Sequence, residues 1–218
     1  MGSRGLHPDP GNKDGWAERI GVIGGTFDPI HVGHLIIAQE ALTRLGLDQI
    51  VFVPAGTPPH KLDHPITDPE HRLEMVRLAV AGNERFSVSR IDIDRSGPCY
   101  TVDTIRLLQD AWSGGTEIYF LIGADSLIDL PTWHRPDLLL RLCHVVALAR
   151  PGYQVDMAAL EHRLPGIGCS IQLIDAPTLD ISATELRDRV RRGWSIRYLV
   201  PHDIESYIKR HCLYRDFS

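Results

Sequence analysis

Two histidines three residues apart, His31 and His34, are the side chains of this sequence best suited to chemistry. They follow the apolar run 20–23 and precede residues with helical periodicity, so they lie where a strand passes into a helix. The first amides of a helix have no partner within the helix and carry partial positive charge, which favours a phosphate at such a junction. Two imidazoles at this spacing can face the same anion. The segment therefore predicts phosphate chemistry.

Three glycines in the same segment, Gly24, Gly25 and Gly33, would let a ligand approach the backbone closely. Neither of two common phosphate motifs, G-x-x-x-x-G-K-[ST] and G-x-G-x-x-G, follows the first expected strand. A lone histidine is more often structural, and two histidines three residues apart lack the acidic third ligand and the general base of a zinc hydrolase motif. It is the pair within the whole segment that favours phosphate binding. Asp28 is interpreted as a turn residue before Pro29 and is left out of the predicted site.

A second candidate anion site lies near the other end of the chain, where Ser182 opens a helical pattern. Ser182 and Glu185 have the spacing of a capping box, and the amides around Thr184, with Arg187 one turn on, could hold phosphates. A capped surface helix is the alternative interpretation, and by itself it is the commoner case. Lys61, in a loop after the second expected strand, is a further candidate for a phosphate contact, although a loop lysine is usually solvated.

The middle of the chain is where a second substrate would be chosen. Thr101 stands at an expected helix start, where a hydroxyl and nearby amides could bind a carboxylate. Trp133 follows the fourth expected strand and could stack on a flat ring at the edge of the sheet. Core packing is the commoner role of a tryptophan in such a place.

The elements that must position these residues alternate along the chain. Short apolar runs predict six buried strands, at 20–23, 50–54, 86–91, 118–122, 145–148 and 171–174. Helical patterns cover 35–45, 69–80 and 102–112, the stretch 152–168 looks like a surface connection, and 181–213 looks like two helices interrupted near 193–201. Strands separated by helices pair in parallel. The predicted fold class is α/β, a Rossmann-like doubly wound parallel sheet with helices on both faces and a small C-terminal helical segment, with ligands at the carboxyl ends of its strands.

Length and composition limit the number of domains and the kinds of partner that the chain can have. With 218 residues and 43% hydrophobic content, we expect a single domain over 19–218, its C-terminal helical part at about 181–218, after a flexible extension over 1–18. A net charge of −5 argues against a broad basic surface for nucleic acid. No signal peptide or membrane span is expected, and four dispersed cysteines without a Cys-x-x-Cys pair predict neither a zinc site nor disulfides. A cytoplasmic location follows as the expectation.

Two segments resemble known signatures. The segments 26–34 and 181–187 resemble, in the right order, the two motifs of the nucleotidyltransferase superfamily, and the similarity to the bacterial nicotinate-nucleotide adenylyltransferase family extends from about Ile20 to Tyr214. The resemblance implies that His31 and His34 contact the α-phosphate of ATP and stabilise its transition state, with Arg187 at the leaving pyrophosphate. It implies ATP-binding roles for the following residues: Gly24, Gly25, Thr26, Phe27, Gly33, Gly123, Asp125, Arg150, Ile181, Ser182 and Thr184. It assigns the acceptor, nicotinate mononucleotide, to Tyr100, Thr101, Trp133 and His134, the last of which is often a tyrosine in the family.

The implied reaction joins ATP and nicotinate mononucleotide to give nicotinate adenine dinucleotide and pyrophosphate, a step of NAD synthesis. Mg²⁺ is expected with the ATP phosphates and not on protein side chains. The expected partners are small-molecule substrates, and binding to nucleic acid or to a membrane is not expected. A homo-oligomer is left open. Two alternatives remain: phosphopantetheine adenylyltransferase, which shares the donor motifs, and a non-catalytic nucleotide-binding module. Nicotinamide mononucleotide competes as the acceptor, since it differs from the nicotinate by an amide in place of a carboxylate.

Overall fold

A parallel sheet forms the centre of the molecule. The structure is a computed structural model that describes residues 18–58, 66–112, 115–149, 154–177 and 179–215. The strands of the described part are β1 (Arg19–Gly25), β2 (Gln49–Pro54), β3 (Phe86–Val88), β4 (Glu117–Gly123), β5 (His144–Ala149) and β6 (Ile171–Asp175). They lie in the order β3-β2-β1-β4-β5-β6, and every neighbouring pair is parallel. The expected α/β class is confirmed.

The strand order reverses between β1 and β4, which lie side by side although the chain forms β2 and β3 in between. In a doubly wound sheet, the connections on the two sides of such a point lead away from one another and leave a crevice at the carboxyl ends of the strands. The histidine segment comes directly after β1. The topology therefore places it at the crevice, as the sequence predicts.

The longer helices begin and end close to their predicted bounds. They are α1 (Val32–Arg44), α2 (Pro69–Val80), α4 (Thr101–Ala111), α9 (Ala183–Arg191) and α10 (His202–Arg210). Asp68 caps α2, its Oδ1 accepting a 2.8 Å hydrogen bond from the amide of Glu70, and Pro69 occupies the first helical position. The two expected C-terminal helices are confirmed as α9 and α10.

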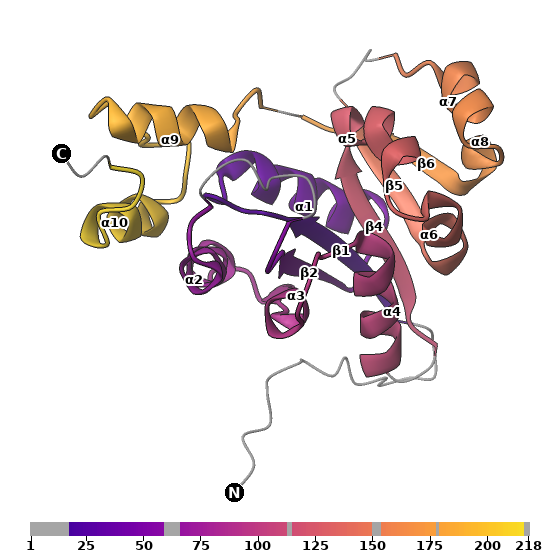
Figure 1. The fold of residues 1–218 in the computed structure, drawn as a ribbon, viewed down its shortest axis with the longest axis horizontal. Coiled ribbons are helices and arrows are strands. Elements are labelled where there is room, and N and C mark those ends of the chain that lie inside the picture. The colour runs from indigo at the N-terminus through magenta and orange to yellow at the C-terminus, as the bar shows by residue number, and fades with distance from the viewer. Residues whose placement is uncertain (1–17, 59–65, 113–114, 150–153, 178, 216–218) are drawn as a thin grey trace, which may run out of the picture.

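Helices cover both faces of the sheet and give two hydrophobic cores. One core joins the strands to α1, α2, α9 and α10, through residues such as Leu42, Met75 and Ile204. The other joins them to α4 and the helices that follow β4 and β5, through residues such as Ile105 and Leu127. Figure 1 shows α9 and α10 beside α1 and α2, far from α7 and α8 at the other side of the molecule. The predicted arrangement with helices on both faces is confirmed.

Several short elements differ from expectation. The third strand ends at Val88, and Ile91, predicted to lie within it, begins the four-residue helix α3 (Ile91–Asp94). The stretch 152–168, expected as a surface connection, contains α7 (Met157–Arg163) and the start of α8 (Ile167–Ser170). Three further short helices follow β4 without having been predicted: α5 (Ala124–Asp129), the 3₁₀ helix η1 (Leu130–Thr132) and α6 (Pro136–Leu142). No helix among the described residues is long and apolar enough to cross a membrane.

Candidate active site

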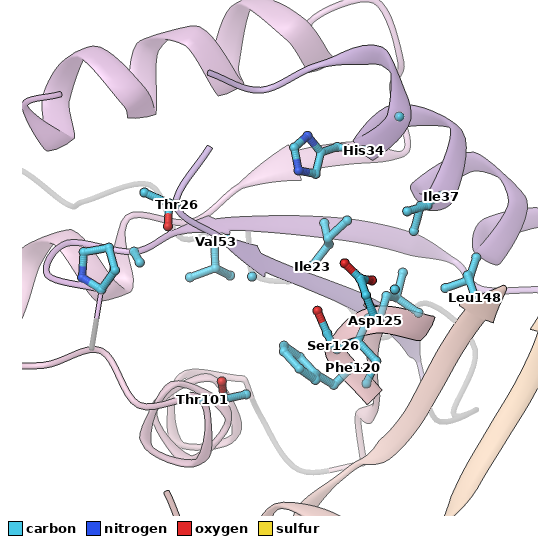
Figure 2. A pocket seen from close by; sticks show the side chains of 18 of the residues that line it. Ile23, Thr26, His34, Ile37, Val53, Thr101, Phe120, Asp125, Ser126 and Leu148 are labelled. Atoms are coloured by element: carbon cyan, nitrogen blue, oxygen red, sulfur yellow. The ribbon is translucent and has the colours of Figure 1, made fainter. Parts of the chain in front are cut away.

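A cavity of about 780 Å³ opens at the carboxyl ends of β1, β2, β4 and β5. Its lining includes most of the predicted site residues: Gly24, Gly25, Thr26, His31, Gly33, His34, Tyr100, Thr101, Gly123, Asp125, Trp133, His134, Ile181 and Ser182. In Figure 2, His34 lies across the strand ends from Thr101, Asp125 and Ser126. Segments more than a hundred residues apart thus share one cleft.

The histidine pair is held ring against ring at the start of α1. The ring centroids of His31 and His34 lie 3.7 Å apart, with 31° between their planes. The buried Phe27 ring packs edge to face on His34, with ring centroids 5.1 Å apart, and supports it from the core side. If both rings were protonated, two positive charges would be in contact and would repel each other. The pair therefore suits a single positive charge facing a single anion.

The protonated nitrogen of His34 follows from its contact with the backbone. The amide of His31 donates a 3.2 Å hydrogen bond to His34 Nδ1. A ring nitrogen that accepts a hydrogen bond carries no proton, so the neutral His34 ring holds its proton on Nε2. Phosphate oxygens are acceptors. His34 therefore offers an anion a donor that is already fixed in orientation.

His31 is the more buried member of the pair. It is 8% exposed, and burial lowers its pKa from 6.5 to about 4. Its Nδ1 has no hydrogen-bond partner among the described residues. A buried nitrogen without a hydrogen bond is unfavourable, so the ring of His31 is held in this position at a cost in free energy.

The helix amides at this end are less available than the sequence suggested. The amide of Val32, first residue of α1, donates a 3.1 Å hydrogen bond to the carbonyl of Leu199, and the amide of His34 donates to the carbonyl of His31. The expectation that the first amides of this helix as a group face a phosphate is therefore wrong for these two. The imidazoles supply more of the donors.

The second predicted motif meets the first through Arg187. Its Nη1 donates a 2.7 Å hydrogen bond to the carbonyl of Asp28, and its Nη2 lies 3.2 Å from Thr184 Oγ1. Ser182 caps α9, its Oγ accepting a 3.1 Å hydrogen bond from the amide of Glu185, and also lines the cavity. Arg187, Thr184 and Phe27 do not line the cavity. Arg187 ties α9 to the histidine segment, and Thr184 accepts from it within the helix.

Two buried charges support this end, and sequence reasoning assigned neither to the site. Arg72 is 1% exposed and donates hydrogen bonds of 2.7 to 3.0 Å to four carbonyls, those of Thr26, Ala55, Gly56 and Thr67. Burial lowers the pKa of Arg72, and the nearby Asp28 carboxylate opposes that shift. One guanidinium thus joins the loop after β1, the end of β2 and the start of α2.

Asp28 is the second buried charge, and its interpretation as a structural residue agrees with its contacts. Its Oδ1 accepts a 2.7 Å hydrogen bond from the Tyr214 hydroxyl, and its Oδ2 accepts one of 3.2 Å from the amide of Thr67. Burial, with the Asp28 charge adding to it, raises the pKa of Tyr214. The turn that follows α10 is thereby bound to the histidine segment.

Aromatic rings form the opposite end of the cavity. Tyr100, the N-cap of α4, stacks on His134 with ring centroids 4.2 Å apart and 26° between the planes. Trp133 packs edge to face on Phe120, with centroids 6.1 Å apart, and also lines the cavity. Trp133 is therefore both a packing residue and a surface of the site, so the two interpretations of the sequence hold together.

Gly123 and Asp125 form the turn from β4 into α5. A Cβ atom at Gly123 would lie 2.5 Å from Asp125 Oδ1, which no side chain could tolerate without displacing that carboxylate. Glycine is therefore required at 123 for the observed place of Asp125, whose carboxylate faces the cavity as an acceptor for hydroxyl groups.

Some residues fall outside this description. Lys61 and Arg150, both predicted to bind ATP phosphates or adenosine, lie outside the described residues. The cavity lining also includes polar residues that the sequence did not single out: Asp92, Thr104, Ser126 and Asp180. Thr104 could have been found from its place one turn after Thr101, whereas Asp92 carries no signal in the sequence that distinguishes it from neighbouring aspartates.

Comparison with known proteins agrees with this geometry. Residues 22–189 match the cytidylyltransferase-like family. A Thermomicrobium roseum protein named "Probable nicotinate-nucleotide adenylyltransferase" is 47% identical over 197 residues, which cover 90% of this chain and 92% of that protein. A Roseiflexus protein of the same name is 47% identical over 196 residues, with coverage of 90% and 98%.

Solved structures show the same fold. The nicotinic acid mononucleotide adenylyltransferase of Plasmodium falciparum, complexed with NaAD, superposes with a TM-score of 0.72 at 20% identity, over 90% of this chain and 97% of that one. Its complex with APC gives a TM-score of 0.70. At 20% identity the solved structures show the fold alone, whereas the relatives at 47% identity show the family. The chain belongs to the cytidylyltransferase-like family and, by its relatives, to the nicotinate-nucleotide adenylyltransferases.

Proposed function

We propose that this protein transfers the adenylyl group of ATP to nicotinate mononucleotide, giving nicotinate adenine dinucleotide and pyrophosphate. The observation that carries the proposal is that one cavity joins His34 and Ser182 at one end to Thr101 and Trp133 at the other. The names of the relatives support the choice of substrates. So does the complex of the Plasmodium falciparum neighbour with NaAD.

The reaction is a substitution at the α-phosphorus of ATP. A phosphate oxygen of the acceptor forms the new bond, and the bond from the α-phosphorus to the oxygen bridging the α- and β-phosphates breaks, so that pyrophosphate leaves with the electron pair. The attacking oxygen is already negatively charged and needs no general base. The protein's task is to align the two substrates and to stabilise charge.

We assign that task at the donor end to the histidine pair. His34 would donate from Nε2 to an α-phosphate oxygen, and His31, buried and neutral, would take on positive character as the anion arrives. Ser182 and the first turn of α9 would face the β- and γ-phosphates. For Arg187 we propose a positioning role in place of the predicted direct contact, because it does not line the cavity and its terminal nitrogens donate to Asp28 and Thr184.

At the acceptor end we assign the pyridine ring to Trp133 and Tyr100. Thr101 and the start of α4 would bind the carboxylate, since a helix N-terminus favours negative charge. His134 contributes its backbone and the ring that stacks on Tyr100. Asp125 and Gly123 would hold the adenosine. The ATP contacts proposed for Lys61 and Arg150 remain predictions, as does a cytoplasmic location.

We further propose Mg²⁺ as the companion of ATP. Mg²⁺ prefers phosphate oxygens and water to all-protein cages, and the side chains that face the phosphates here are imidazoles and a hydroxyl, which suit anions better than this ion. The phosphates of ATP would therefore be its main ligands. When bound, it neutralises charge on the leaving pyrophosphate.

The decisive experiment is a panel of acceptors offered with ATP and Mg²⁺, scored by pyrophosphate release. We expect release with nicotinate mononucleotide, less with nicotinamide mononucleotide, and none with phosphopantetheine. Release with phosphopantetheine alone would replace the proposed acceptor. Binding of ATP with no release across the panel would make the chain a nucleotide-binding module.

A further inference from the structure

A buried carboxylate, Asp92, lies next to the acceptor end of the cavity and has no role in the chemistry described above. It is the second residue of α3, is 4% exposed and lines the cavity. Both its carboxylate oxygens lie 2.9 Å from Thr104 Oγ1, and Oδ1 accepts a 2.8 Å hydrogen bond from Arg95 Nε. Burial raises the pKa of Asp92, while Arg95 and Thr104 oppose the shift. The carboxylate is thus engaged from two sides.

Arg95 and Thr104 extend these contacts to Tyr100. Arg95 Nη2 lies 3.3 Å from the carbonyl oxygen of Tyr100 and 3.4 Å from Thr104 Oγ1. The amide of Thr104 donates a 3.1 Å hydrogen bond to the same carbonyl. Tyr100 and Thr101 are the residues with which α4 begins and with which it lines the cavity. Asp92, Arg95 and Thr104, called the α4 anchor below, therefore fix the first turn of that helix.

The α4 anchor has little room to shift. A Cβ atom at Gly56 would lie only 2.3 Å from the carbonyl oxygen of Asp92, so α3 packs directly on the backbone that follows β2. The Sγ of Cys99 donates to that carbonyl at 3.3 Å, and the amide of Cys99 donates to the carbonyl of Thr57. A displacement of Asp92 would therefore be transmitted to the start of α4 and not absorbed by a loop.

We propose that Asp92 is a positioning residue for the acceptor nucleotide, acting through Thr104 and Arg95 on Tyr100 and Thr101. The inference rests on the proposed function and deepens it. The carboxylate oxygens of Asp92 accept hydrogen bonds from Thr104 and Arg95. Through them Asp92 fixes the positions of the Tyr100 ring and the Thr101 hydroxyl. Loss of the α4 anchor would weaken the binding of the acceptor nucleotide. It would leave the binding of ATP unchanged, because Arg72 and Asp28 hold that end of the cavity.

The sharpest test is Thr104→Val, which keeps the shape of the side chain and removes the hydroxyl between Asp92 and Tyr100. We expect KM for nicotinate mononucleotide to rise about tenfold, the scale of one lost hydrogen bond to a charged group. KM for ATP should stay at its wild-type value. Thr104→Ser keeps the hydroxyl and should restore most of the acceptor affinity, which a merely structural role for the methyl group would not do.

Two aspartates of the same short helix give a matched pair. Asp92→Asn should raise the acceptor KM at least as much as Thr104→Val. Asp94→Asn makes the same change at a half-exposed carboxylate that pairs with Arg90 at 2.8 Å, and should leave both KM values unchanged. If Asp92→Asn does not fold, the comparison of Thr104→Val with Thr104→Ser still decides.

Equilibrium binding separates this inference from the proposed function. Titration of the wild-type protein with nicotinate mononucleotide tests the function, and no binding with no turnover would sink it. If the wild type binds and turns over, then equal acceptor affinity in Thr104→Val, a parallel rise of both KM values, or a Thr104→Ser variant as weak as Thr104→Val would each overturn the positioning role.

Discussion

The two ends of the cavity are held by contacts of very different reach along the chain. At the donor end, Arg187 reaches Asp28 across 159 positions and Tyr214 reaches it across 186. At the acceptor end, Arg95 reaches Asp92 across 3 positions and Thr104 reaches it across 12. The donor end is therefore assembled from both termini of the fold, whereas the start of α4 at the acceptor end is fixed within one local stretch.

This difference has a physical consequence for how each end responds to change. Contacts between distant segments form only when the whole domain is folded, so the donor end depends on the packing of α9, α10 and α2 around it. The local anchor at α4 depends on fewer elements. Changes at the donor end should thus affect stability and turnover together, whereas changes at the acceptor end should affect one substrate.

The largest effect is expected at Arg72. Arg72→Met removes a buried guanidinium and leaves four carbonyls without their donor, which should lower the free energy of unfolding by about 3–5 kcal/mol. Arg77→Met, in the same helix but half-exposed and 3.7 Å from Glu74, is the matched control and should cost less than about 1 kcal/mol. Urea unfolding of both variants measures the difference, and equal losses would break the comparison.

His34 should separate chemistry from acceptor binding. His34→Ala removes the oriented Nε2 donor, and we expect kcat to fall about 10²–10³-fold, as for the loss of one transition-state donor. The Kd for nicotinate mononucleotide should not change, because the acceptor end does not depend on this ring. Near-normal turnover in a folded variant would refute the role of His34.

The burial of His31 predicts how stability depends on pH. Its pKa is about 4 in the folded chain, against the ordinary value of 6.5 that the unfolded chain keeps, so between these values the unfolded chain binds the extra proton. The neutral His31 ring therefore favours the folded chain fully above pH 6.5, and this stability is lost as the pH falls towards 4. The free energy of unfolding should fall by about 3 kcal/mol over that range. His31→Gln should flatten the curve of unfolding free energy in this window. A wild-type curve as flat as the variant's would contradict the assignment.

The smallest effect is expected at Tyr214. Tyr214→Phe removes the hydroxyl that donates to the buried Asp28 carboxylate and should cost about 1.5–3 kcal/mol of stability, with a rise in KM for ATP. Tyr198→Phe changes a side chain that is 81% exposed and should be silent. A rise in the acceptor KM as large as that for ATP would mean that the two ends are not independent.

Much of the fold and of the site was predictable because each rested on a local pattern. Buried strands show as apolar runs, and capped helices of eight or more residues show as periodic segments. Elements such as α3, α7 and η1 have too few residues for a period, and their packing decides them. The cavity residues were found through two motifs and two aromatic segments. Arg72 and the α4 anchor were missed because a buried charged side chain is recognised by the groups that it contacts. The sequence alone does not show which residues those contacts join.

The hydrogen bond from the His31 amide to His34 also bears on the design of inhibitors. Because Nδ1 accepts from the backbone, the other ring nitrogen of His34 carries the N–H group, and a compound that binds this nitrogen must present a lone pair to it. A sulfonyl or carboxyl oxygen meets that requirement, whereas an amine or amide N–H would face a like donor. Compounds that differ in this one atom should therefore differ in affinity even where their shapes coincide.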